Sequence, residues 1–205
     1  MSTQLIRVAA DVIRMYFKSG EYKKNFNAQE LADLVVTHAA AAGVAAMAAG
    51  ILPGAGTLVA TGIAVGAIWT MYYRIARYLE LNLAKEAWKA IASAVLSNII
   101  TQLAGVLVLE IAIGFVPGAS IVAAGAVNFG ITYVAGIIYL KALTGIFAAG
   151  KDPKKMNMDD MSRYFSTAAE NVNAKSVFKE SKSVFKEMQK DGSLKEKGSR
   201  TTIEK

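Results

Sequence analysis

Two long stretches of this chain contain no lysine or arginine, although the chain carries 23 basic residues in 205. The first covers residues 25–73 and the second covers residues 90–140. A helix that faces water needs a polar side, whereas a helix in lipid excludes charge. The pattern therefore predicts a membrane domain of apolar helices over residues 25–150.

Each basic-free stretch is interrupted once by a Pro-Gly turn, so each predicts two helices joined as a hairpin. The hairpins are expected at about 28–79 and 92–147, and each arm holds roughly 20 apolar residues, enough to cross a hydrocarbon core. The predicted fold class is all-α, with two tandem transmembrane helical hairpins flanked by amphipathic cytoplasmic helices. The four arms are expected at about 31–52, 57–79, 91–116 and 121–147. The turn residues are Pro53, Gly54, Gly56, Pro117, Gly118 and Ser120.

The two hairpins form an internal repeat. Residues 50–56 align with residues 114–120, an offset of 64 positions (114 minus 50). The same offset pairs Ala28 with Ala92, Thr37 with Thr101, His38 with Gln102 and Gly66 with Gly130. This favours a duplication, and both hairpins are expected to point the same way.

Polar segments flank the apolar domain. Residues 1–24 have apolar positions at helical spacing, which predicts an amphipathic helix of about 15 residues that lies on a membrane surface or packs on a neighbouring helix. Residues 151–192 contain Ser-Val-Phe-Lys-Glu twice, which predicts a cytoplasmic helix with one apolar stripe. That stripe comprises Val177, Phe178, Val184, Phe185 and Met188. Residues 193–205 are expected to form a disordered tail.

The charge distribution sets the expected topology. The net charge is +7, and every basic residue lies outside the two basic-free stretches. The Pro-Gly turns carry no charge, so the positive-inside rule places both termini and the connector between the hairpins in the cytoplasm. Because the turns are apolar, hairpins that enter and leave the same leaflet are the alternative to full spans. No nucleic-acid partner is expected, because the basic residues flank apolar helices.

Five polar residues interrupt the apolar arms. Glu110 lies about 10 Å along its helix from the second turn. An ionisable group at that depth is a functional candidate, and the alternative is a protonated side chain that fixes packing. His38 lies about 22 Å from the first turn, at a different depth from Glu110. Asn98, Gln102 and Asn128 are expected to bond across helices, or alternatively to line a narrow polar path.

Small residues recur at a spacing of four in both hairpins. Gly62 and Gly66 form one pair, and Ala126 and Gly130 occupy the aligned positions. Such pairs let helix backbones approach closely in lipid. We expect them at helix–helix contacts, either within the chain or between the chains of a homo-oligomer.

Residue combinations typical of enzymes are missing from the sequence. The chain has no cysteine, one histidine and no Gly-Lys-Ser/Thr phosphate loop. We therefore expect no catalytic residues, no cofactor and no metal site.

The second hairpin carries the motifs of a family resemblance. An apolar helix leads to a Pro-Gly turn and then to a Gly/Ala-rich helix in which an aromatic residue precedes a glycine, at Pro117, Gly118, Tyr133 and Gly136. Over about residues 28–192 the chain resembles the YcjF-like bacterial membrane proteins of unknown function, which occur alone or fused to small Ras-like GTPase domains. Ser120 replaces the second glycine of that family's turn. The resemblance implies a bacterial inner-membrane location and a GTPase partner, and it supplies no catalytic residue.

The sequence thus favours a non-enzymatic integral membrane protein whose partner is the lipid bilayer, acting as a scaffold, shaping factor or anchor. The main alternative is a pore-forming or channel protein of colicin-like character, because those domains are also small, basic and helical and hide an apolar hairpin. A conventional soluble helical bundle is the third interpretation.

Overall fold

A computed structural model describes residues 2–18, 26–49, 57–81, 91, 95–105 and 119–203. Every regular element in these ranges is a helix, so the all-α class is confirmed for the described chain. Residues 95–105 are also helical. The elements are α1 (Thr3–Lys18), α2 (Ala28–Ala49), α3 (Thr57–Tyr78), α5 (Ala119–Ala148), the short 3-10 helix η1 (Pro153–Lys155), α6 (Met158–Asn171), α7 (Ala174–Lys190) and α8 (Ser193–Ile203).

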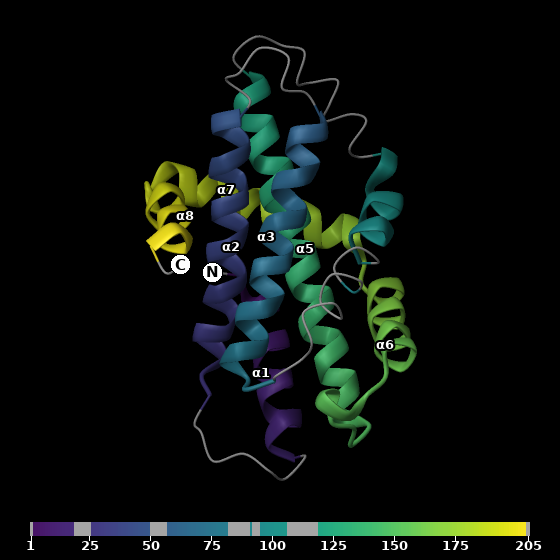
Figure 1. The fold of residues 1–205 in the computed structure, drawn as a ribbon. Helices are drawn as coiled ribbons and strands as arrows, with labels where there is room; N and C mark the ends of the chain where they lie inside the picture. Colours follow the sequence, from purple (N-terminus) through teal and green to yellow (C-terminus); the bar gives the residue numbers. More distant parts are fainter. Residues whose placement is uncertain are drawn as a thin grey trace.

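Helix α5 is the centre of the bundle (Figure 1). All thirteen residues at 128–140 are buried, and α1, α2, α3, α6 and α7 all pack against this helix. A helix that is apolar on every side is stable only when neighbours cover every side. The sequence of α5 between Ala119 and Leu140 contains no charged residue, which suits this central position.

Close contacts fix how α2 and α3 lie on α5. A Cβ atom added at Gly136 would lie 2.5 Å from Val35 of α2 and 3.3 Å from the sulfur of Met71 of α3. Tyr72 stacks on Tyr139 with ring centroids 4.2 Å apart. These contacts join the C-terminal half of α5 to the N-terminal half of α2 and to the C-terminal half of α3.

Local sequence signals explain where several helices begin and end. Gly150 has φ +66°, and the backbone amides of Gly150 and Lys151 bond to carbonyls of the last turn of α5, an ending that favours glycine. Asn157 caps α6 through the amide of Asp160 at 2.8 Å. Asn173 caps α7 in the same way.

The predicted helices of the first hairpin and the fourth arm agree with α2, α3 and α5 to within a few residues. Of the third arm, the structure describes Ile91 and residues 95–105, which are helical. Ser120 lies in the first turn of α5. Pro53, Gly54, Gly56, Pro117, Gly118 and Glu110 lie outside the described residues.

The prediction of a disordered tail is wrong for most of its length. Ser193–Ile203 form α8, which packs along α2. Gly198 allows the approach, because a Cβ there would lie 3.0 Å from Val44 and 3.3 Å from the carbonyl oxygen of Ala40. The polar sequence of the segment hides this helix, since among its described side chains at 193–200 the only buried hydrophobic one is Leu194, and Gly198 supplies the close contact.

Two described helices are long and apolar enough to cross a membrane. They are α2 and the part of α5 from Ile121 to Ala148, and a shorter apolar helix runs from Val95 to Gly105. Helix α3 is not among them. The core helix of a soluble protein passes the same length test, and the α5 stretch is 72% buried inside the bundle. Length and composition therefore indicate membrane association without fixing a topology.

Candidate membrane interface

Helix α7 crosses the bundle against the middle of α5 (Figure 1). In that view α7 runs across the long axes of α2, α3 and α5 rather than along them. The crossing lies at Gly130, where an added Cβ would meet ring atoms of Phe178 at 2.4 and 2.6 Å and the hydroxyl of Ser181 at 3.0 Å. The Phe178 ring thus occupies the space that a side chain at position 130 would fill.

A second aromatic side chain extends this contact to α2. The ring of Phe185 lies 5.5 Å from that of Phe129 and 3.2 Å from the position of a Cβ at Gly43. The predicted apolar stripe of this helix is confirmed, because Val177, Phe178, Val184, Phe185 and Met188 are all buried. The stripe explains which face of α7 packs inward, and two glycines on different helices explain where it packs.

Beyond this crossing the bundle continues as a charge-free end. We define the apolar end as residues 43–49 of α2, 57–65 of α3, 95–105 and 119–130 of α5, which contain no Asp, Glu, Lys or Arg. From Gly130 to Ala119, α5 extends about 16 Å past α7 at 1.5 Å per residue. Ala48, Ile100, Gly105 and Val122 are exposed there.

The opposite part of the bundle carries charged residues, and we call it the charged body. Going away from the apolar end, the first charged residues on the three long helices are Asp33, Arg74 and Lys141. The amphipathic helices α1 and α6 cover the C-terminal half of α5 at this level, where Tyr16 and Phe147 meet with ring centroids 5.0 Å apart. On the three long helices, charge-free and charged stretches are therefore separated along the length of the molecule.

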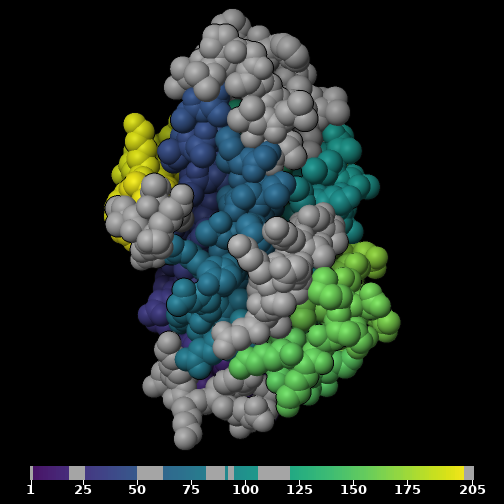
Figure 2. Space-filling view, viewed as in Figure 1, coloured from purple at the N-terminus to yellow at the C-terminus, as the bar shows by residue number. Residues whose placement is uncertain are grey.

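The four predicted packing residues behave differently. Gly130 lies at a close helix contact, with the amphipathic α7, and Ala126 is buried. Gly62 and Gly66 make no such contact with the described residues, because an added Cβ would meet nothing within 4 Å. Their helix, α3, lies at the molecular surface (Figure 2). Among the described residues no helix therefore contacts these two glycines closely, and a contact between chains stays a prediction.

Two of the polar residues predicted inside the apolar arms, His38 and Asn128, are buried. His38 is 2% exposed, and its Nδ1 lies 2.8 Å from the carbonyl oxygen of Leu34. Asn128 donates to the carbonyl of Ala124 on its own helix at 3.0 Å. Its Oδ1 and the Thr132 hydroxyl are buried without a hydrogen-bond partner among the described residues. Bonding across helices is therefore not seen at Asn128.

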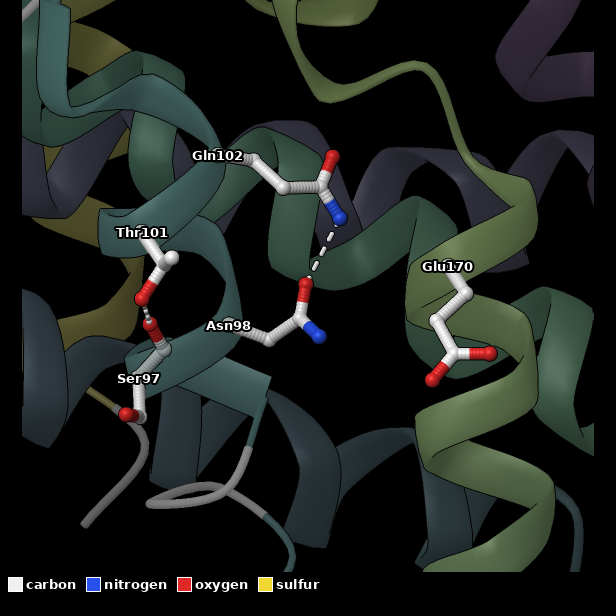
Figure 3. A pocket seen from close by; sticks show the side chains of 5 residues that line it. All are labelled: Ser97, Asn98, Thr101, Gln102 and Glu170. Atoms are coloured by element: carbon white, nitrogen blue, oxygen red, sulfur yellow. Dashed lines mark hydrogen bonds between the residues drawn. The ribbon is translucent and has the colours of Figure 1, made fainter.

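Gln102 does bond across helices. Its Nε2 donates to Asn98 Oδ1 at 2.6 Å and to the carbonyl oxygen of Ala169 in α6 at 2.8 Å. The side chains lie in a shallow groove of about 570 Å³ (Figure 3). The groove is lined by Ser97, Asn98, Thr101, Gln102 and Glu170. Within the described ranges no group of three or more His, Asp or Glu residues is placed to hold a metal ion.

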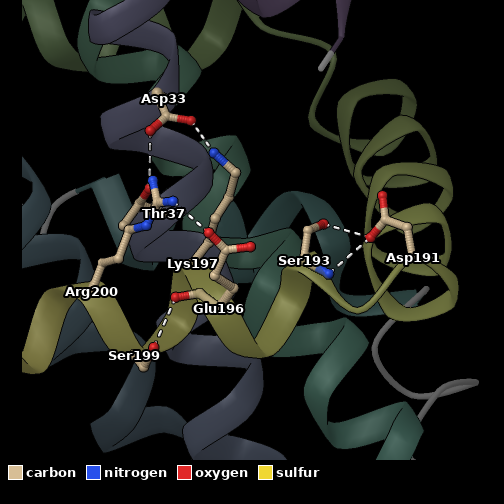
Figure 4. Close-up of polar contacts among 8 residues, drawn as sticks. All are labelled: Asp33, Thr37, Asp191, Ser193, Glu196, Lys197, Ser199 and Arg200. Atoms are coloured by element: carbon tan, nitrogen blue, oxygen red, sulfur yellow. Dashed lines mark hydrogen bonds and ion pairs between the residues drawn. The ribbon is translucent and has the colours of Figure 1, made fainter.

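An ion pair that we did not predict ties α8 to α2. Lys197 of α8 pairs with Asp33 of α2, and Asp33 also accepts a hydrogen bond from Thr37 (Figure 4). At the start of α8, the side chain and amide of Ser193 donate hydrogen bonds to Asp191 and lower the pKa of that carboxyl group. The sequence signal that pointed to this ion pair was Asp33, one of two acidic residues in the first basic-free stretch.

Three parts of the molecule follow one another along one axis. They are the apolar end, the lysine-containing helix α7 and the charged body. Comparisons with family models, with curated proteins and with solved structures find no match for this chain.

Proposed function

We propose that this chain is a non-enzymatic membrane protein that inserts its apolar end into one leaflet and acts as an anchor, scaffold or shaping factor. The observation that carries the proposal is the docking of α7 on the middle of α5 at Gly130. The proposal selects the re-entrant form of the two hairpins over full spans.

The charge of α7 argues against a full span of α5 in this arrangement. If residues 121–148 crossed the bilayer, α7 would lie inside the hydrocarbon region, about a third of the way along α5. Helix α7 carries five lysines, and each charged residue at the bilayer centre costs about 2.5–3.5 kcal/mol on insertion scales. A bilayer that stops at α7 avoids this cost.

The length of the apolar end supports insertion into one leaflet. The described part of α5 reaches about 16 Å beyond α7, and half of a hydrocarbon core is about 15 Å. The exposed apolar side chains there, Val122 and Ile100 among them, then face acyl chains. The charged body remains in water.

The remaining parts of the proposal come from the sequence. The basic flanks favour the cytoplasmic leaflet of a bacterial inner membrane, with both termini in the cytoplasm. The resemblance to the YcjF-like family adds a GTPase partner, and the small-residue pair Gly62 and Gly66 adds homo-oligomer formation.

Depth-dependent quenching tests the proposal directly. The chain has no cysteine, so single fluorophores can be attached at Ala48→Cys or Val122→Cys in the apolar end, and at Met158→Cys near the opposite end. Val122 and Met158 are each 39% exposed, which makes them a matched pair. We expect acyl-chain nitroxide lipids to quench the first two positions, and a water-soluble quencher to reach Met158→Cys. Equal access of the water-soluble quencher to all three positions would refute insertion.

One observation favours the second candidate, a pore-forming protein of colicin-like character. Amphipathic helices cover the long apolar helix α5, as expected of a closed state that opens at a membrane. In that case α2 and α5 would have to separate from α7 and α8 before they could span the bilayer.

A further inference from the structure

The charges of α7 are divided between its two sides. Measured from the buried Ser181 at about 100° per residue, all five lysines fall between about 100° and 180° on one side. Glu180 and Glu187 fall at about 100° and 120° on the other side. We call the first group the lysine flank. It comprises Lys175, Lys179, Lys182, Lys186 and Lys190.

Contacts of α7 show which way its lysine side and its glutamate side face. Glu180 accepts hydrogen bonds from Ser2, next to the start of α1, and from Tyr133 Oη at 3.4 Å. Tyr133 lies on the charged-body side of the Gly130 crossing, so the glutamates face the charged body.

The opposite side of α7 faces the apolar end. Phe185 lies about 40° toward the lysine side of the stripe, and its ring reaches Gly43. Gly43 is level with Gly125, since a Cβ on either glycine would lie 3.1 Å from the other's carbonyl oxygen. Gly125 lies on the apolar-end side of Gly130. The lysine flank is therefore turned toward the end that carries no charge.

We propose that the lysine flank binds the headgroups of anionic phospholipids at the surface into which the apolar end inserts. This inference rests on the proposed function, which sets the bilayer surface at the level of α7. A helix that lies across the bundle axis then lies in the membrane plane, as interfacial amphipathic helices do. Lysine stems pass along the apolar surface while their ammonium groups reach the phosphates.

The position of every lysine on one side of α7 favours anionic lipid, rather than water alone, as the surroundings of the lysine flank. An exposed helix face needs only a mixture of charges to remain soluble, and such a mixture has no reason to place every lysine on the side of the apolar end. The negative surface potential of anionic lipids attracts basic side chains within a Debye length. The glutamates, turned away from that surface, are not repelled by it.

Vesicle flotation with two matched triple variants tests the proposal. The first variant, Lys175→Gln/Lys179→Gln/Lys186→Gln, neutralises three exposed members of the lysine flank. The control, Lys151→Gln/Lys154→Gln/Lys155→Gln, neutralises three exposed lysines beyond the far end of α5. Both remove three positive charges from the full-length chain. Each is mixed with vesicles of phosphatidylcholine alone or with added phosphatidylglycerol, at low and high salt.

We expect the flank variant to partition about 100-fold less onto vesicles with phosphatidylglycerol at low salt, about fivefold for each lysine. The control should change little, and high salt should remove most of the difference. On phosphatidylcholine alone the two variants should behave alike. Equal partitioning of the two variants onto the anionic vesicles would overturn the proposal and leave an acidic protein surface as the partner of the flank.

A fluorophore at Val122→Cys in the same samples separates this inference from the proposed function. Acyl-chain quenching on both vesicle types, together with flank-dependent binding to anionic vesicles, supports both. Flank-dependent binding that leaves the fluorophore in water would keep the lipid contact of the lysines and reject insertion.

Discussion

A close approach between α7 and α5 depends on the absence of a side chain at Gly130. Gly130 leaves room for the ring of Phe178, whereas Gly66, its equivalent in the sequence repeat, faces open space among the described residues. The sequence identifies both as small residues on apolar helices, but it contains no information on which one another helix covers. The sequence predicts that each glycine permits a close helix contact. Only the fold shows that α7 makes that contact at Gly130.

Because α7 covers Gly130 and no described residue covers Gly66, the same substitution is expected to have different effects on stability at the two positions. Gly130→Leu should destabilise the protein by about 1–3 kcal/mol, because the new side chain displaces buried Phe178 from a packed contact. Gly66→Leu should be neutral or stabilising by up to about 1 kcal/mol, since leucine is the better helix former at an open position. Urea denaturation followed by circular dichroism measures both, and equal shifts for the two variants would contradict the packing at Gly130.

At the scale of the helix, periodicity predicts faces and bounds but not partners. The apolar stripe of α7 and the extents of α2, α3 and α5 follow from the sequence because they depend on local spacing and on local breaks. For residues 1–24 the sequence left two alternatives open, and α1 takes the second by packing on α2 and α5. Helix α8 escaped prediction because its stability comes from Asp33 and Ala40, more than 150 positions away in the sequence.

One hydrogen bond joins the end of α1 to the end of α3. The hydroxyl of Tyr16 donates to the carbonyl oxygen of Leu79 at 2.6 Å in a buried position. The last carbonyls of a helix lack partners within the helix, so this side chain completes the ending of α3.

Removing that hydroxyl should weaken the docking of α1. We expect Tyr16→Phe to lower the free energy of unfolding by about 1 kcal/mol, or about 2–4 °C in melting temperature for a chain of this size. Tyr73→Phe is the matched control, because Tyr73 is 49% exposed. Thermal unfolding followed by circular dichroism gives both values. A Tyr16→Phe protein as stable as the control would show that the Leu79 carbonyl finds an equivalent partner.

At the scale of the whole molecule, the order of surfaces along one axis could not be predicted from the sequence. Basic-free stretches and amphipathic flanks are visible in the sequence, and they suggested helices that span the bilayer with polar helices beyond it. The structure instead packs the polar helices around the apolar ones, because α5 has apolar residues on every side and each side needs cover. The polar helices on either side of the apolar stretches in the sequence thus determine how much apolar surface stays exposed to lipid.

Two mechanisms use this arrangement in opposite ways. In the anchor, α7 and α8 stay on the bundle, and only the apolar end enters the membrane. In a pore-former, these helices leave, and α2 and α5 become free to span. The contact between α8 and α2 distinguishes them, because one mechanism preserves it and the other breaks it.

A disulfide across this contact provides the test. A Cβ at position 198 would lie 3.0 Å from Val44 Cγ2, close enough for the double variant Val44→Cys/Gly198→Cys to form a disulfide without large movement. We expect the oxidised and reduced forms to float with vesicles to the same extent and to release little trapped dye, since the anchor never needs to separate α8 from α2. The single variant Val44→Cys controls for the substitution itself. If oxidation instead abolished membrane retention and reduction restored it together with dye release, α2 would have to leave α8 in order to act. That result would replace the anchor with the pore-former, because the described part of α5 reaches only about 16 Å beyond α7 while α7 stays docked.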